Sequence, residues 1–253
     1  LLNGEPIQLR GFGKHEESPL HGRGLNLPQL VKDFHLLRWI GANSVRTSHY
    51  PYSEEFLDLA DEFGVLVIDE VFSINLDFRR TNDATMANHK RAVGELIDRD
   101  ANRTCVIAWS LANEPGYLAE PAYREKSAPY WRELFAHARA LDSTRLMTHA
   151  NVGYAGNDDP AFDESDFLGM NRYHGWYSSP GQIEAGVAAL RADFDEVAAH
   201  GKPIVLLEFG ADALAGQHAT YDQLFTEEYQ QRLIAAYWAE IERHPALAGG
   251  HVW

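Results

Sequence analysis

Short apolar runs alternate with longer amphipathic segments along almost the whole chain, and this alternation narrows the choice of fold more than any other property of the sequence. The apolar runs have the length of buried strands, and the longer segments repeat their apolar residues with a helical period. Strands are predicted at residues 7–13, from 43, at 65–70, at 104–111, from 145, from 166, at 203–208 and at 249–253. Helices are predicted at residues 27–40 and 53–62, in a segment that ends near 100, and at 123–141, 183–200 and 226–243.

Eight strands with helices between them predict an α/β fold, a (β/α)8 TIM barrel. A doubly wound sheet is the alternative, but no glycine fingerprint follows the first strand. We expect residues 1–253 to form a single barrel domain. Because the sequence stops at Trp253, at the end of the eighth strand, the barrel is expected to lack its last helix. The chain is accordingly expected to be a segment of a longer multidomain protein.

The acidic composition argues against several kinds of partner. The formal net charge is −15, whereas nucleic-acid binding needs a basic surface. No apolar run reaches the roughly 20 residues of a membrane helix, and the N-terminus lacks the basic and apolar regions of a signal peptide. The one cysteine, Cys105, lies in an apolar run and is expected to be a small core residue. With no signal peptide and no disulfide, the cytoplasm is the favoured compartment.

Polar and aromatic side chains follow the predicted strands at the points where the strands end. In a TIM barrel these points converge on one face, which carries the functional site. Such convergence predicts a polar pocket for a sugar-like ligand. No spacing of histidine and carboxylate residues resembles a metal site, so neither a metal nor a cofactor is expected. The strand-end residues include His15, Arg46, His49, Asp69, Glu70, Asn113, Glu114, Asn171, Tyr173, Glu208 and Trp253.

Two of these residues, Glu114 and Glu208, are carboxylates at the ends of the fourth and seventh strands. Two carboxylates that face each other across a barrel mouth suit glycoside hydrolysis, in which one protonates the leaving oxygen and the other attacks the sugar or activates water. Arg46 is expected to support Glu208 by favouring its ionised form. The alternative is structural: Glu114 as a turn carboxylate before Pro115, and Glu208 as a strand-end carboxylate paired with a cation.

Seven motifs give the chain a resemblance to the glycoside hydrolases of the β-glucuronidase and β-galactosidase family. The resemblance implies a retaining, double-displacement mechanism, with Glu114 as the general acid/base and Glu208 as the nucleophile about 5 to 5.5 Å apart. It also implies a sugar pocket formed by His15, Asn113, Asn171, Tyr173, Tyr177 and Trp253, with Arg46 and His49 in support. The motifs are G-F-G-K-H-E from Gly11, G-R-G from Gly22, W-I-G-A-N-S-V-R-T-S-H-Y-P-Y from Trp39, V-I-D-E from Val67, W-S-L-A-N-E-P from Trp109, N-R-Y-H-G-W-Y from Asn171 and L-E-F-G from Leu207.

The stretch N-R-Y-H-G-W-Y and the spacing H-E-x-x-x-x-x-G-R-G resemble the β-glucuronidase branch, which implies β-D-glucuronides as substrates. The alternatives are a β-galactosidase or β-mannosidase of the same family, or an isolated barrel segment without turnover. The family's Asn-x-Lys pair for the sugar carboxylate would lie beyond the eighth strand, and its β-sandwich domains would precede the barrel. The expected partner is a small carbohydrate conjugate, with homo-oligomers formed through the missing domains.

The remaining candidates are expected to be structural. His89 and His149 are interpreted as structural or solvated, and Trp109 and Trp131 as core residues. Asp69 and Glu70 are expected to orient their neighbours rather than to react.

Overall fold

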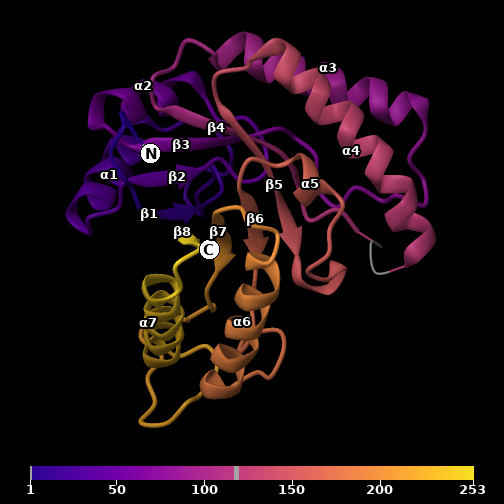
Figure 1. Cartoon of the computed structure of the whole chain (residues 1–253). Coiled ribbons are helices and arrows are strands. Elements are labelled where there is room, and N and C mark those ends of the chain that lie inside the picture. The colour runs from indigo at the N-terminus through magenta and orange to yellow at the C-terminus, as the bar shows by residue number, and fades with distance from the viewer. Residues whose placement is uncertain (1, 117–119) are drawn as a thin grey trace.

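The computed structural model describes residues 2–116 and 120–253, and in these residues eight parallel strands close into a barrel (Figure 1). The strands are β1 Leu9–Gly13, β2 Ser44–Arg46, β3 Leu66–Glu70, β4 Val106–Asn113, β5 Leu146–Val152, β6 Leu168–Asn171, β7 Ile204–Phe209 and β8 Leu247–Val252. The helices are α1 Leu27–Trp39, α2 Glu54–Phe63, α3 Asp83–Asp100, α4 Pro121–Leu141, α5 Ala161–Glu164, α6 Ile183–Ala198 and α7 Glu227–Arg243. The predicted TIM barrel is therefore confirmed.

Neighbouring strands pair in sequence order, and the barrel closes where β1 pairs with β8. In that last pair Leu9 lies opposite Gly249 and Gly11 opposite His251. Gly249 has a φ of 140°, and a Cβ atom at this position would overlap the backbone of Leu9. Glycine is thus required where the first and last strands meet, because only glycine combines this backbone conformation with so close an approach.

Helices α2 and α3 begin at capping residues that the sequence marks. Ser53 accepts a hydrogen bond from the backbone N–H of Phe56 at the start of α2, and Gly64 ends that helix in the left-handed conformation. Asn82 and Thr85 form a reciprocal capping box at the start of α3. These local signals explain why the helix boundaries lie close to those predicted.

The core has two layers, one inside the barrel and one between the strands and the helices. A small cluster fills the barrel interior and includes Leu9, Ile68, Ala108, Ala150 and Leu207. The larger clusters lie outside the strands, and Figure 1 shows the helices that cover them, with α3 beside α4 and α6 beside α7. Because side chains alternate along a strand, adjacent strand residues belong to different layers.

Several residues expected to be structural are confirmed as such. Trp109 and Trp131 are fully buried, and Trp109 donates its indole N–H to Asp142. Cys105 is buried, and burial raises the pKa of its thiol to about 12, so it is held as a thiol. His89 is also buried and lies within hydrogen-bonding distance of the Leu111 carbonyl.

Two short elements between β5 and β6 are not predicted from the sequence, the 3-10 turn Gly153–Ala155 and the four-residue helix α5. One turn of helix is too short to show an apolar period. The predicted first strand also began two residues early, because the structure starts β1 at Leu9. None of the helices in the described part of the chain is long and apolar enough to cross a membrane.

Candidate active site

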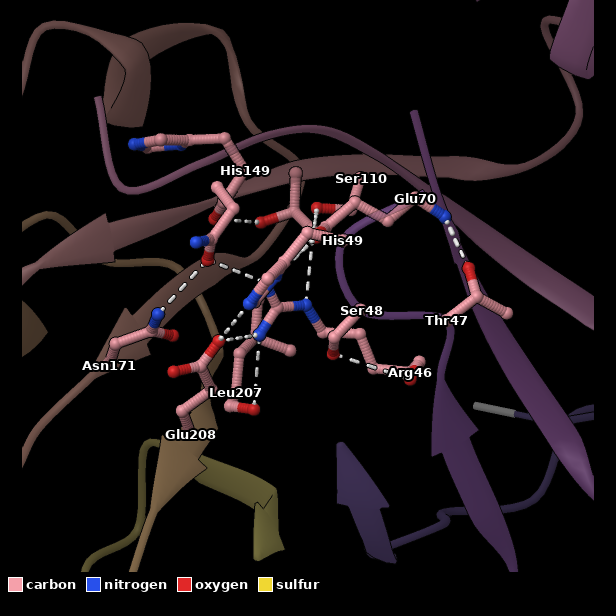
Figure 2. Close-up of polar contacts among 12 residues, drawn as sticks. Arg46, Thr47, Ser48, His49, Glu70, Ser110, His149, Asn171, Leu207 and Glu208 are labelled. Atoms are coloured by element: carbon pink, nitrogen blue, oxygen red, sulfur yellow. Dashed lines mark hydrogen bonds and ion pairs between the residues drawn. The ribbon is translucent and has the colours of Figure 1, made fainter. Parts of the chain in front are cut away.

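Arg46, the last residue of β2, is the centre of the candidate site at the C-terminal end of the barrel. Its side chain has no solvent exposure. Its guanidinium donates from Nε and Nη2 to the two oxygens of Glu70, at 2.8 and 3.0 Å, and from Nη1 to Oε1 of Glu208 at 2.7 Å. Nη2 also donates to Oδ1 of Asn113 at 2.7 Å. Figure 2 shows these contacts, which link β2 to strands β3, β4 and β7 through one side chain.

Glu70 is held from several sides. Ser110 donates its hydroxyl to Oε2 at 2.7 Å, and Nδ1 of His49 lies 3.0 Å from Oε1. Burial disfavours the Glu70 carboxylate, but the charge of Arg46 and the bond from His49 outweigh burial and lower the pKa of Glu70 to about 2. Glu70 is therefore an anion at neutral pH, and its partner Arg46 is a cation whose pKa these carboxylates raise against the effect of burial.

Glu208 lies near the end of β7, and each of its carboxylate oxygens receives a hydrogen bond. Arg46 donates to Oε1 at 2.7 Å, and the Tyr173 hydroxyl donates to Oε2 at 2.8 Å. Nε2 of His49 lies 3.7 Å from Oε1. Burial and the nearby charge of Glu208 raise the pKa of Tyr173, which keeps that phenol protonated as a donor. Glu208 is thus held by a charge-assisted bond on one oxygen and by a phenol on the other.

Glu114 follows the last residue of β4 and has a different environment. Its φ is 50°, an uncommon left-handed conformation for a residue other than glycine, and its backbone N–H is held by the carbonyl of Ala150. The Asn171 side chain donates to Oε1 of Glu114 at 2.9 Å. Burial raises the pKa of Glu114, the charge of Glu208 adds to this rise, and the Asn171 bond opposes it. The two carboxyl groups thus have different neighbours, an amide beside Glu114 and a guanidinium and a phenol at Glu208.

Aromatic rings cover one side of the site. The Trp253 ring stacks on His49 with ring centroids 5.0 Å apart, and His15 meets the edge of Trp253 at 5.2 Å. His15 also stacks on Tyr50 at 5.8 Å. Burial lowers the pKa of His15, and the nearby His49 lowers it further. Both effects favour the neutral form of the His15 ring. A neutral ring and an indole form a surface suited to a sugar face.

A cavity of about 420 Å³ opens beside Glu114. Its walls include Asn171, Tyr173 and two exposed rings, Tyr177 with 75% and Tyr154 with 64% of its surface accessible. Tyr177 packs against Tyr173 at a centroid distance of 4.9 Å. A larger cavity of about 740 Å³ lies between α1 and α2, but it is lined by residues of those helices and their loops, away from both carboxylates. Of these two cavities, only the one beside Glu114 is lined by predicted site residues.

The structure brings all of the predicted site residues into one connected group. Hydrogen bonds join seven of them, and ring contacts add the other three. Glu208 is bonded to Tyr173, which lines the 420 Å³ cavity, but it is not itself among the lining residues. The hydrogen-bonded members are Arg46, His49, Asn113, Glu114, Asn171, Tyr173 and Glu208, and the ring contacts add His15, Tyr177 and Trp253.

Three further residues around this group are not among the predicted site residues. Ser110 contacts Glu70, while Tyr154 and His174 line the cavity beside Glu114. A polar serine inside the apolar run of β4 was a usable signal, since alternation directs it into the barrel. In the described residues, no group of three or more histidine, cysteine and carboxylate side chains is arranged to hold a metal ion.

Comparison with known proteins gives a consistent result. Residues 1–252 match a family model described as the TIM barrel domain of glycosyl hydrolases family 2. The chain is 40% identical to a β-glucuronidase of Paenibacillus borealis and 39% identical to that of Mus musculus, with the whole chain aligned in both cases. It covers 43% and 39% of those proteins, so it spans about two-fifths of their length.

Solved structures agree with the sequence relatives. A Bifidobacterium dentium β-glucuronidase complexed with coumarin-3-O-glucuronide superposes with a TM-score of 0.94 at 37% identity, over 100% of this chain and 41% of that one. A Ruminococcus gnavus β-glucuronidase in complex with uronic isofagomine superposes with a TM-score of 0.94 at 35% identity, over 100% of this chain and 45% of that one.

Proposed function

The chain belongs to glycosyl hydrolase family 2, as the TIM barrel domain of that family, and from this premise we propose that it hydrolyses β-D-glucuronides with retention of configuration at the anomeric carbon. The observation that carries the proposal is the contrast between Glu114 and Glu208. Burial favours the protonated form of Glu114, whereas Arg46 and Tyr173 donate to both oxygens of Glu208. A retaining glycosidase needs one protonated carboxyl group as the acid and one ionised carboxyl group as the nucleophile.

The first step joins the sugar to the enzyme. An oxygen of the Glu208 carboxylate attacks the anomeric carbon, the bond to the leaving oxygen breaks, and the proton of Glu114 passes to that oxygen. In the second step the ionised Glu114 takes a proton from water, which attacks the anomeric carbon and releases Glu208. We expect the two carboxyl groups to be about 5 to 5.5 Å apart, the spacing at which no water fits between nucleophile and sugar.

The neighbouring amides are suited to bind the sugar hydroxyl groups. Oδ1 of Asn171 is buried and has no hydrogen-bond partner among the described residues, so it can accept a bond from a ligand. Nδ2 of the same residue is occupied by Asn113 and Glu114. Trp253, His15 and Tyr177 supply apolar or aromatic surface around this polar centre. A small carbohydrate conjugate fits such a mixed pocket.

The choice of glucuronides rests on the relatives, several of which are β-glucuronidases. We also propose that the chain is one domain of a longer protein, because it matches only 43% of the Paenibacillus borealis enzyme and 39% of the mouse enzyme. Residues outside the chain would then complete the recognition of the sugar carboxylate.

Hydrolysis of nitrophenyl β-glucuronide, β-galactoside and β-mannoside by the purified protein tests the proposal. We expect the glucuronide to have the highest kcat/KM, and Glu208→Gln to lower kcat on the order of 10⁴-fold or more, since the nucleophile forms the covalent intermediate. NMR of the first product formed should show the β-anomer. Equal hydrolysis by the wild type and Glu208→Gln would refute the assigned nucleophile, and a preference for galactoside would refute the substrate.

A further inference from the structure

We propose that Glu70 is a positioning residue that balances the charge of Arg46, so that the nucleophile can give up its own charge to the sugar. This inference rests on the proposed function, because it concerns the step in which Glu208 becomes an ester. Glu70 touches neither the sugar pocket nor the reacting atoms, and it acts through Arg46.

The geometry makes Glu70 the principal partner of Arg46. Two parallel bonds, 2.8 and 3.0 Å long, join the guanidinium to both oxygens of Glu70, whereas a single Arg46 nitrogen reaches the carboxylate of Glu208 (Figure 2). Bidentate pairs of this kind fix both orientation and charge. Neither Arg46 nor Glu70 has any solvent exposure, so water cannot take the place of either partner.

Glu70 is fixed independently of Glu208. Ser110 donates to Oε2, His49 lies 3.0 Å from Oε1, and the backbone N–H of Glu70 donates to the Thr47 hydroxyl at 2.8 Å. The carboxylate therefore stays in place while the other carboxylate reacts.

The charges of the three groups explain why this matters. In the free enzyme Arg46 carries one positive charge, and Glu70 and Glu208 carry one negative charge each, which leaves one net negative charge. A bond from Glu208 to the anomeric carbon removes the charge of the Glu208 carboxylate, and the positive charge of Arg46 is then neutralised by Glu70 alone. Without Glu70 the same step would leave a buried guanidinium with no counter-charge, and an unpaired buried charge is strongly unfavourable.

Other titratable groups face Glu208 and must be considered in any pH profile. They lie on several elements of the barrel mouth and contribute to the electrostatics of the nucleophile. These groups are Arg46 and His49 at the end of β2, Tyr173 after β6, Glu114 after β4 and His15 after β1.

The preceding residue, Asp69, provides a matched control. Asp69 lies on the same strand as Glu70, is equally buried and carries the same chemical group. It points out of the barrel, however, where it accepts a hydrogen bond from Thr47 at 2.8 Å and lies near Asp100. Burial and the neighbouring charge of Asp100 raise the pKa of Asp69 well above its ordinary value. Asp69→Asn thus removes a buried carboxyl group without removing a charge from the site.

The test measures covalent labelling of Glu208 by a 2-deoxy-2-fluoro-β-glucuronyl fluoride, together with the pH profile of kcat/KM. In Glu70→Gln we expect labelling to slow on the order of 100-fold. We also expect the acid limb to move to lower pH, because the loss of one negative charge stabilises the Glu208 carboxylate. The labelling rate of Asp69→Asn should stay within about twofold of the wild type, and the acid limb of its kcat/KM profile should not move, because the charge around Glu208 is unchanged.

Glu70→Asp keeps the negative charge on a shorter side chain, and it provides the test if Glu70→Gln does not fold. Its acid limb should stay at the wild-type position while labelling is slowed to an intermediate extent. Three outcomes would overturn the role of Glu70 without affecting the proposed function. They are labelling of Glu70→Gln at the wild-type rate, a shift of the acid limb in Glu70→Asp as large as in Glu70→Gln, and a loss of labelling rate in Asp69→Asn as large as in Glu70→Gln. A folded wild type that is not labelled at all would overturn the proposed function together with it.

Discussion

Individual residues in this site differ in chemistry because they differ in neighbours. Glu114 and Glu208 are the same amino acid, yet one lies in a partly buried position beside an amide, and the other receives bonds from a guanidinium and a phenol. The sequence was sufficient to place both at strand ends. The sequence does not show that Arg46 forms two bonds with Glu70 and only one with Glu208, because the distances between these side chains depend on how the barrel closes.

The raised pKa of Glu114 has a consequence for stability. When the pKa of a carboxyl group is higher in the folded state than in the unfolded state, the free energy of unfolding falls as the pH rises from the unfolded to the folded pKa. Burial of the Glu114 carboxyl group therefore costs stability above its ordinary pKa, and Glu114→Gln should raise Tm by a few degrees while lowering activity.

Differential scanning calorimetry at pH 7 checks this prediction. Glu95→Gln, at an exposed position on α3, is the control and should leave Tm within about one degree of the wild type. A lower Tm for Glu114→Gln would contradict the inferred burial cost.

At the scale of elements, the predicted strands and helices agree with the structure where a local signal marks their ends. Ser53 and Gly64 enclose α2, and both were read correctly. The short helix α5 was missed, since four residues carry no period. The opposite orientations of Asp69 and Glu70 follow from strand alternation, but which of the two faces the barrel interior depends on the register of β3 within the closed sheet.

The closure between β1 and β8 gives a prediction for one glycine. Gly249→Ala should destabilise the protein by about 4 kcal/mol or more, because the new methyl group would overlap the backbone of Leu9 and the φ of 140° is unfavourable for alanine. Gly41→Ala is the matched control. Gly41 also has a positive φ, 76°, but a Cβ there meets nothing within 4 Å, so the cost should be about 1 kcal/mol. Urea unfolding of both variants measures the difference, and equal costs would contradict it.

The closed barrel as a whole holds a buried histidine in its neutral form at neutral pH. His251 lies inside the barrel, and burial together with Arg46 lowers its pKa to about 3. A histidine whose folded pKa is lowered contributes stability above its unfolded pKa of 6.5, and this stability is lost as the pH falls toward the folded value. Asp69 and Glu114, whose pKa values are raised, act in the opposite sense over part of this range.

The contribution of His251 is therefore best seen as a difference between variants. Between pH 7 and pH 5 the free energy of unfolding should decrease by about 2 kcal/mol more in the wild type than in His251→Gln. His35→Gln, at an exposed position on α1, should show the same decrease as the wild type. Urea titrations at the two pH values give these numbers, and an equal decrease in His251→Gln would show that His251 titrates normally.

The bond between Arg46 and Glu208 also determines when the site can come into existence during biosynthesis. The two residues are 162 positions apart in the sequence. At translation rates of about 5 to 20 residues per second, the second partner is added roughly 8 to 32 s after the first. Arg46 and Glu70 are made close together in time, so the guanidinium has a counter-ion long before the nucleophile leaves the ribosome. The buried cation and its bidentate counter-charge, 24 positions apart, are therefore both in the chain before the nucleophile is synthesised.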